Sequence, residues 1–259
     1  MDGGSALSDP FRTILADPGW TFDNKLRMGD GVKRGAEDHY QMSMSVKDIC
    51  ALGKPQTYFA QHGKRDRLLD WTIAGQLTTD VGFLCLWAPA AFILDGSATK
   101  VARAWGYEPK QIVPWVKGRI ALVPPRDGCH NLPDPQLILQ VGQGRTFRNV
   151  VELLVICTRG EGYTKLVKNK GTSGLIVAEE DAVILAPRRK SITRGVEHST
   201  KPLEQYSLIE STLPGPYLEL FACEPREGWT SYGSMLGHLM TPDGIEPFAH
   251  PNPGLEWPA

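Results

Sequence analysis

Short apolar runs bounded by turn or polar residues recur along the chain, and this pattern is typical of buried strands. Four such runs occur before residue 160, and a fifth follows the breaker sequence Pro214-Gly215-Pro216. Two further strands are expected on either side of the Glu179-Glu180-Asp181 turn. The five main predicted strands are Thr13–Ala16, Gly82–Trp87, Gln111–Val116, Val151–Cys157 and Tyr217–Phe221.

Helical patterns lie between several of these strands. Val46–Leu52 predicts a short helix, and Ala90–Trp105 predicts a longer one that ends before Gly106, a suitable C-terminal glycine. Leu203–Leu213 predicts a third helix, with Pro202 in its first turn. Alternating strands and helices favour an α/β fold in which a mostly parallel sheet carries helices on both faces.

Three long connections interrupt this alternation: Thr21–Ser45, Gly53–Asp80 and Gly118–Asn149. Long loops in compact domains are usually functional or disordered. In an open α/β sheet, ligands bind at the carboxyl ends of the strands, where such loops gather. The pattern therefore predicts a ligand site at the carboxyl ends of the strands, but it does not indicate the chemistry of that site.

Length and composition limit the class of protein. The chain has 259 residues, of which 41% are hydrophobic, so one large domain with a substantial core is expected. No uncharged run is long enough to span a bilayer, and the first residues lack the features of a signal peptide. Five scattered cysteines without CxxC spacing argue against a disulfide framework and a zinc site. These features predict a cytoplasmic location and no metal.

The net charge of -1 is an average over unlike parts of the chain. Residues 224–259 contain five acids and one base, a charge of -4, which leaves +3 on the preceding residues. Basic residues cluster within Lys54–Arg67 and within Arg188–Lys201. Either cluster alone is most simply a solvated surface. Together the two clusters are compatible with a surface that binds phosphate groups, and hence with a nucleic-acid partner.

The sequence Asp17-Pro18-Gly19-Trp20 directly follows the first predicted strand. Asp-Pro-Gly by itself is a common turn. At the end of a buried strand, however, it places a carboxylate, a rigid turn and an aromatic ring together. Such a set suits methylation of an exocyclic amine, because Asp17 and the Pro18 carbonyl can accept its N–H groups while Trp20 stacks on the extruded base.

The sequence resembles the MT-A family, which includes the catalytic subunit of the mRNA adenosine-N6 methyltransferase and bacterial and phage relatives. Ordered matches extend from about Thr13 to Leu236, which makes the resemblance more specific than one short motif. The matching stretches are Ile14-Leu15-Ala16-Asp17-Pro18-Gly19-Trp20, His39-Tyr40-Gln41-Met42-Ser43, Leu84-Cys85-Leu86-Trp87, Trp115-Val116-Lys117, Arg148-Asn149 with Glu152, Thr158-Arg159-Gly160, His198-Ser199-Thr200-Lys201-Pro202, Pro214-Gly215-Pro216-Tyr217-Leu218-Glu219-Leu220-Phe221, and Gly228-Trp229 with Gly233.

The resemblance implies a Rossmann-like fold in permuted (β-class) motif order and transfer of a methyl group from S-adenosylmethionine to adenine N6. It implies that Asp17-Pro18-Gly19-Trp20 is the catalytic motif and that Asp17 also adjoins the cofactor. It further implies that Lys201 faces the cofactor's carboxylate and that Glu219 and Phe221 cradle its adenosine. Ser234 matches a cofactor contact, and Tyr40 matches a residue at the rim of the active site.

This sequence departs from the family pattern at three positions. Gly19 replaces the second proline of Asp-Pro-Pro-Trp, which gives the motif more backbone freedom and weaker pre-organisation. Cys223 stands where some relatives have a basic residue, and Ser234 shortens an expected amide. These departures leave open a second interpretation, a binding partner subunit that keeps the fold with little catalytic activity.

Other polar residues have weaker signals. Arg148 and Asn149 are candidate contacts to substrate or cofactor, although a loop pair bonded to the backbone is an almost equal alternative. Glu152 and Lys117 are interpreted as internal polar partners rather than catalysts.

The sequence therefore predicts a methyltransferase domain over residues 8–240 and a proline-rich, irregular tail over 241–259. Residues 53–80 and 118–149 are candidate target-recognition loops. DNA is the first choice of substrate, because the compact chain looks more like the bacterial and phage members, and RNA is the alternative. The expected location is the cytoplasm of a bacterial or phage-infected cell, as a homodimer or with a partner subunit, without membrane contact.

Overall fold

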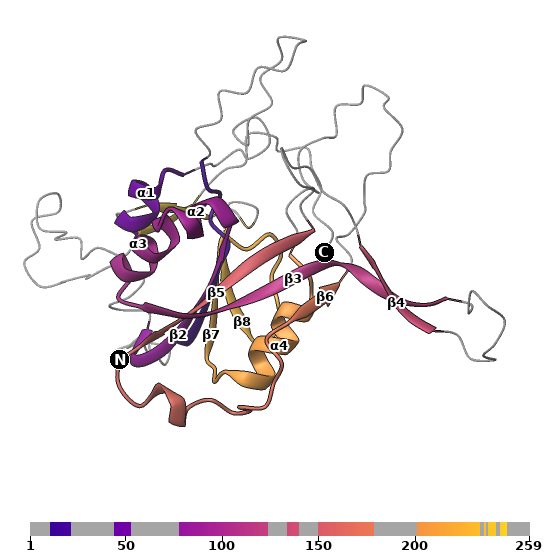
Figure 1. Ribbon diagram of the computed structural model, residues 1–259. Helices are drawn as coiled ribbons and strands as arrows, with labels where there is room; N and C mark the ends of the chain where they lie inside the picture. The colour runs from indigo at the N-terminus through magenta and orange to yellow at the C-terminus, as the bar shows by residue number, and fades with distance from the viewer. Residues whose placement is uncertain are drawn as a thin grey trace, which may run out of the picture.

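A computed structural model describes residues 11–21, 44–52, 78–123, 134–139, 150–178, 201–233, 236, 238–241 and 244–247. These residues form a sheet with helices packed against it (Figure 1). The elements are β1 (Phe11–Ala16), α1 (Val46–Ala51), β2 (Thr78–Ala88), α2 (Ala90–Leu94), α3 (Ser97–Ala104), β3 (Glu108–Val123), β4 (Asp134–Leu139), β5 (Val151–Arg159), the 3-10 turn η2 (Tyr163–Lys165), β6 (Ile176–Ala178), α4 (Glu204–Thr212), β7 (Tyr217–Leu220), β8 (Trp229–Tyr232), β9 (His238–Thr241) and β10 (Gly244–Pro247).

The main sheet is mixed. Its eight strands follow the order β4-β3-β5-β2-β1-β7-β8, with β6 paired to β3. The half made of β2, β1, β7 and β8 is parallel throughout. In the other half, β5 runs antiparallel to both β2 and β3, and β4 runs antiparallel to β3. The predicted α/β class therefore holds, whereas the parallel arrangement describes the first half and the β3–β6 pair rather than the entire sheet.

Alternating residues of the strands build two cores, one on each face of the sheet. In β2, Leu84 and Leu86 enter one apolar cluster, while Cys85 and Trp87 enter the other. Buried residues of α1, α2 and α3 complete the first cluster, and Tyr206 of α4 joins the second. Figure 1 shows α1, α2 and α3 together and α4 apart from them. Helices thus cover both faces, as the alternation of elements predicts.

Local sequence explains where the helices begin and end. Ser45 and Asp48 form a reciprocal capping box at the start of α1. The single helix predicted over Ala90–Trp105 is instead two helices, α2 and α3, because Gly96 adopts a left-handed conformation with φ 82° between them. None of the helices in the described part of the chain has the length and apolar character required to span a bilayer.

Strands occur in two regions where none was predicted, the long connection 118–149 and the irregular tail 241–259. The predicted connection 118–149 begins with the second half of β3, which continues to Val123 and pairs with β4 to form a two-stranded ribbon beyond the body (Figure 1). Gly118 permits this close pairing, because a Cβ there would collide with the Ile138 carbonyl oxygen. In the predicted tail 241–259, β10 pairs with β9 as a hairpin. Cross-strand pairing, which depends on distant residues, decides both cases.

Candidate active site

Charged residues from five segments meet at one edge of the sheet, where the parallel strands reach their carboxyl ends. Asp17 directly follows β1, and Glu219 lies near the end of β7. Glu152 lies near the start of β5, which reaches the same edge because β5 runs antiparallel to β2. Lys117 lies on β3 beyond the pairing of Trp115 with Glu152, and Lys201 precedes α4. The fold therefore places polar groups where α/β proteins bind ligands.

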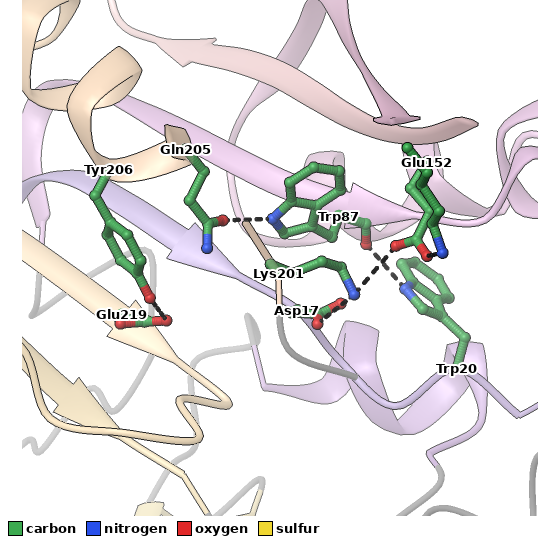
Figure 2. Close-up of polar contacts among 9 residues, drawn as sticks. Asp17, Trp20, Trp87, Glu152, Lys201, Gln205, Tyr206 and Glu219 are labelled. Carbon is green, nitrogen blue, oxygen red and sulfur yellow. Dashed lines mark hydrogen bonds and ion pairs between the residues drawn. The ribbon is translucent and has the colours of Figure 1, made fainter. Parts of the chain in front are cut away.

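Four of these side chains form a chain of ion pairs with alternating charge. Lys201 Nζ lies 2.7 Å from Asp17 Oδ2 and 3.3 Å from Glu152 Oε2. Lys117 Nζ lies 2.6 Å from Glu152 Oε1. Figure 2 shows the carboxylates of Asp17 and Glu152 turned toward the ammonium group of Lys201. Each carboxylate thus has a cation partner, and Glu152 binds both lysines.

Burial and neighbouring charges together shift the pKa values of the two carboxyl groups in opposite directions. Burial raises the pKa of Asp17, and Lys201 opposes this shift without cancelling it. Burial would also raise the pKa of Glu152, but Lys201 and Lys117 together outweigh it and hold this pKa below its usual range. Asp17 is therefore the carboxylate whose ionisation depends most closely on its one strong cation partner.

Trp20 occupies a different environment from the one expected of a stacking platform. Its side chain is buried, with 5% of the residue exposed, and its ring stacks on Phe92 with centroids 5.0 Å apart. Its Nε1 donates a hydrogen bond to the Trp87 carbonyl oxygen at 2.9 Å (Figure 2). These contacts correct the expectation that Trp20 presents an open face to a base. They make it a core residue that supports the loop carrying Asp17.

Trp87 connects the end of β2 to the segment that carries Lys201. Its Nε1 donates to Gln205 Oε1 at 2.8 Å, and Lys201 Nζ lies 5.5 Å from the centroid of its ring. The indole face favours a nearby cation. Trp87 and Gln205 were not predicted as site residues. The sequence signal for Trp87 was its place at the end of a buried strand, but Gln205 carries no comparable local signal.

Tyr206 and Glu219 form a second polar group near the ion-pair chain, and their contacts bear on whether the site can bind S-adenosylmethionine. Tyr206 Oη donates to Glu219 Oε1 at 2.8 Å, whereas Glu219 Oε2 is buried and has no hydrogen-bond partner among the described residues. Burial raises the pKa of Glu219 to about 7. A buried acceptor without a hydrogen-bond partner lowers the stability of the fold. Such an atom is suited to accept a hydrogen bond from a bound ligand. A ribose hydroxyl supplies such a donor, so the residues present fit this cofactor.

The backbone after β7 also permits a close approach. Phe221 has a positive φ of 65°, which is rare for a residue with a side chain. A Cβ on Gly233 would overlap the backbone of Ala222, so only glycine fits there. Cys223 is exposed, and the charges of Asp17 and Lys201 act on its thiol. Phe221 and Cys223 therefore border the same charged edge as Asp17.

The structure assigns places to only some of the predicted site residues. It brings Asp17, Lys201 and Glu219 to the charged edge and joins Glu152 to Lys117 as internal polar partners, as the sequence predicts. The remaining predicted contacts lie outside the described residues: Tyr40, Arg148, Asn149 and Ser234. The basic stretch 54–67 lies outside them as well, as does the stretch 188–201 except for Lys201.

Comparison with known families gives one match. The family model described as MT-A70 matches residues 55–235, which is more than half of the chain. The matched range contains Lys117, Glu152, Lys201 and Glu219, whereas the segment with Asp17 precedes it. No curated protein matches the chain significantly.

Proposed function

The chain belongs to the MT-A70 family of methyltransferases, which use S-adenosylmethionine to methylate adenine N6 in nucleic acid, and we propose that its substrate is DNA. The charged edge supports methyl transfer to an amine through one observation. Asp17, a carboxylate that directly follows a central parallel strand, is ion-paired with Lys201, and its charge also acts on Glu219, whose Oε2 has no hydrogen-bond partner among the described residues. An acceptor for the amine and an acceptor for a cofactor hydroxyl thus lie on neighbouring strands.

In this proposal Asp17 and the Pro18 carbonyl accept the N–H groups of the target amine. An exocyclic amine is a weak nucleophile because its lone pair is delocalised into the base. Two acceptors on its N–H groups return electron density to nitrogen and fix its orientation. The ionised form of Asp17 is the better acceptor, and the Lys201 ammonium favours that form against the effect of burial.

Four residues are proposed to hold the cofactor together with Asp17. Lys201 offers an ammonium group for its carboxylate, and Glu219 offers an oxygen for a ribose hydroxyl. Phe221 is proposed to flank the adenosine, and Ser234, which follows Gly233 in the sequence, is proposed as a further cofactor contact. When bound, S-adenosylmethionine supplies a methyl group on a cationic sulfur, so displacement by the amine needs no further activation of the donor.

The nucleic acid is proposed to contact the long connections that the sequence predicts. Tyr40, Arg148 and Asn149 belong to two of these loops, and residues 53–80 and 118–149 are the proposed recognition segments of a catalytic domain spanning 8–240. The β3–β4 ribbon supports this assignment for residues 118–149, because it extends beyond the body and exposes Ile120. The modest positive charge before residue 224 predicts weak, salt-sensitive non-specific binding.

Incubation with labelled S-adenosylmethionine and duplex DNA, single-stranded DNA or RNA tests the proposal directly. Nucleoside mass spectrometry then identifies the polymer and the methylated atom. We expect N6-methyladenine in DNA, and no label in polymers that lack adenine. N6-methyladenosine in RNA alone would replace DNA as the substrate class, and no transfer to any of the three would refute the enzymatic assignment.

A non-catalytic partner subunit is the second candidate, favoured by Gly19 in the catalytic motif and Cys223 in place of a basic residue. Calorimetric titration with S-adenosylmethionine separates the two candidates. A methyltransferase binds the cofactor, whereas a subunit that retains only the fold and nucleic-acid binding gives no heat above that of dilution.

A further inference from the structure

The ion-pair chain at the charged edge extends beyond the residues proposed to touch the ligands. Its far end is Lys117 on β3, which forms an ion pair with Oε1 of Glu152, while Oε2 of Glu152 faces Lys201. Lys201 in turn lies closer to Asp17 than to Glu152, at 2.7 Å against 3.3 Å. Among the ion pairs of the described residues, Glu152 therefore links Lys117 to the Asp17–Lys201 pair.

The surroundings hold Lys117 in place. Its backbone N–H donates to the Val150 carbonyl oxygen at 2.9 Å, and β6 pairs with β3 at this position through Ala178. The residue is 8% exposed, and its ammonium group lies 5.1 Å from the centroid of the Trp115 ring. A buried cation whose backbone is held by β6 and by the residue before β5 can in turn fix the carboxylate that it binds.

Glu152 and Asp17 compete for Lys201. With Lys117 present, Glu152 Oε1 already has an ion-pair partner. The shorter of the two Lys201 contacts is then the one to Asp17. Without Lys117, Glu152 would be a partly buried carboxylate whose main cation among the described residues is Lys201. Because an uncompensated buried charge is costly, Lys201 would then move toward Glu152 and away from Asp17.

We propose that Lys117 is a positioning residue for methyl transfer: by neutralising Glu152, it leaves Lys201 to hold the Asp17 carboxylate in the ionised, amine-accepting state. This inference rests on the proposed function of Asp17. The simpler alternative is an ion pair that only stabilises the junction of β3 and β5. That alternative predicts a loss of stability when Lys117 is replaced, with no change in the ionisation of Asp17.

Carboxyl carbon NMR titration of Asp17, assigned with Asp17→Asn, separates these alternatives without any turnover. The charged and titratable groups around Asp17 are Lys201 before α4, Glu152 on β5, Glu219 on β7 and Cys223 after β7. Lys117→Met should raise the titration midpoint of Asp17 by about one pH unit, a tenfold change in its acid constant. Lys117→Arg should restore the wild-type midpoint. An unchanged midpoint in folded Lys117→Met would overturn the proposal.

A second variant keeps the proposal testable if Lys117→Met does not fold. Glu152→Gln removes the competing carboxylate, so Lys201 should bind Asp17 alone and the Asp17 midpoint should fall. A midpoint that rises or stays constant in this variant contradicts the competition. Arg103→Met is the matched control, because Arg103 forms an exposed ion pair with Glu108. This control should leave the Asp17 midpoint unchanged.

Kinetics then link the titration to methyl transfer. At saturating cofactor, the acid limb of the kcat–pH profile should move upward in Lys117→Met by about one pH unit, the same shift as the NMR midpoint, so kcat falls about tenfold at pH values below both midpoints. Lys117→Arg should recover most of kcat. An acid limb of the kcat–pH profile that stays at its wild-type position while the Asp17 midpoint shifts would refute the role in transfer. If wild type methylates no polymer, the proposed function fails, and the NMR titration still decides the electrostatic role of Lys117.

Discussion

The ammonium group of Lys201 lies 2.7 Å from a carboxylate oxygen of Asp17 and thereby joins the segment before α4 to the turn after β1. Both side chains are largely buried, with 13% and 24% of their surfaces exposed. In such surroundings an unpaired carboxylate would take up a proton more readily. The pair therefore decides whether the proposed amine acceptor carries its charge.

The amide variant Asp17→Asn tests the acceptor directly. The two side chains have nearly the same shape, but the amide has one acceptor oxygen and no charge. We expect kcat to fall at least ~100-fold, as when an electrostatic contact to the reacting group is lost. The calorimetric Kd for S-adenosylmethionine should remain within a few-fold of wild type. Methylation at the wild-type rate would remove Asp17 from the mechanism.

The buried contacts of Trp20 predict a structural effect for Trp20→Phe. The change leaves the Trp87 carbonyl oxygen without its donor, which should lower the free energy of unfolding by about 1–3 kcal/mol. The control Trp105→Phe removes the similar buried bond to the Ile49 carbonyl oxygen. Urea denaturation should give comparable losses for both variants, with nearly unchanged affinity for nucleic acid. A loss of affinity specific to Trp20→Phe would instead favour base stacking.

The ionisation of Glu219 predicts a dependence of stability on pH. Burial raises its pKa from the usual 4.5 to about 7, so the folded protein retains a proton that the unfolded chain has released within this window. This group therefore contributes stability at low pH, and the contribution is lost as the pH rises through about 4.5 to about 7. Glu219→Gln should remove this part of the pH dependence.

Urea denaturation of wild type and Glu219→Gln at several pH values across the window measures this contribution. Other titrating groups affect both proteins alike, so the difference between their free energies of unfolding isolates Glu219. Parallel curves for the two proteins would contradict the raised pKa.

The close approach at Gly233 predicts a strict requirement for glycine. In Gly233→Ala, the added methyl group would overlap the backbone of Ala222, which cannot move without disturbing its hydrogen bond to Tyr232. We expect a loss of about 1–3 kcal/mol in the free energy of unfolding, typical of overpacking. Gly171→Ala is the control, since a Cβ there meets only the Asn169 side chain at 3.5 Å. Thermal melting should show a large shift for Gly233→Ala and almost none for Gly171→Ala.

Local patterns were sufficient for much of the fold. The five predicted apolar strands correspond to β1, β2, β3, β5 and β7, because an apolar run bounded by polar residues has few alternatives to burial. The alternation of strands and helices predicted mostly parallel strands, so it did not reveal the antiparallel β5. They also missed β4, whose pairing with β3 depends on a partner rather than on its own composition.

The sequence alone determined the alternation of strands and helices, the motif Asp17-Pro18-Gly19-Trp20 and the chemistry available to a carboxylate after a buried strand. Only the tertiary structure decided that Lys117, Glu152 and Lys201 form one chain ending at Asp17, and that Trp20 is buried. The reason is physical. Residue types and spacing are local properties, whereas ionisation and hydrogen bonding depend on burial and on distances of a few ångströms between segments that are remote in the sequence.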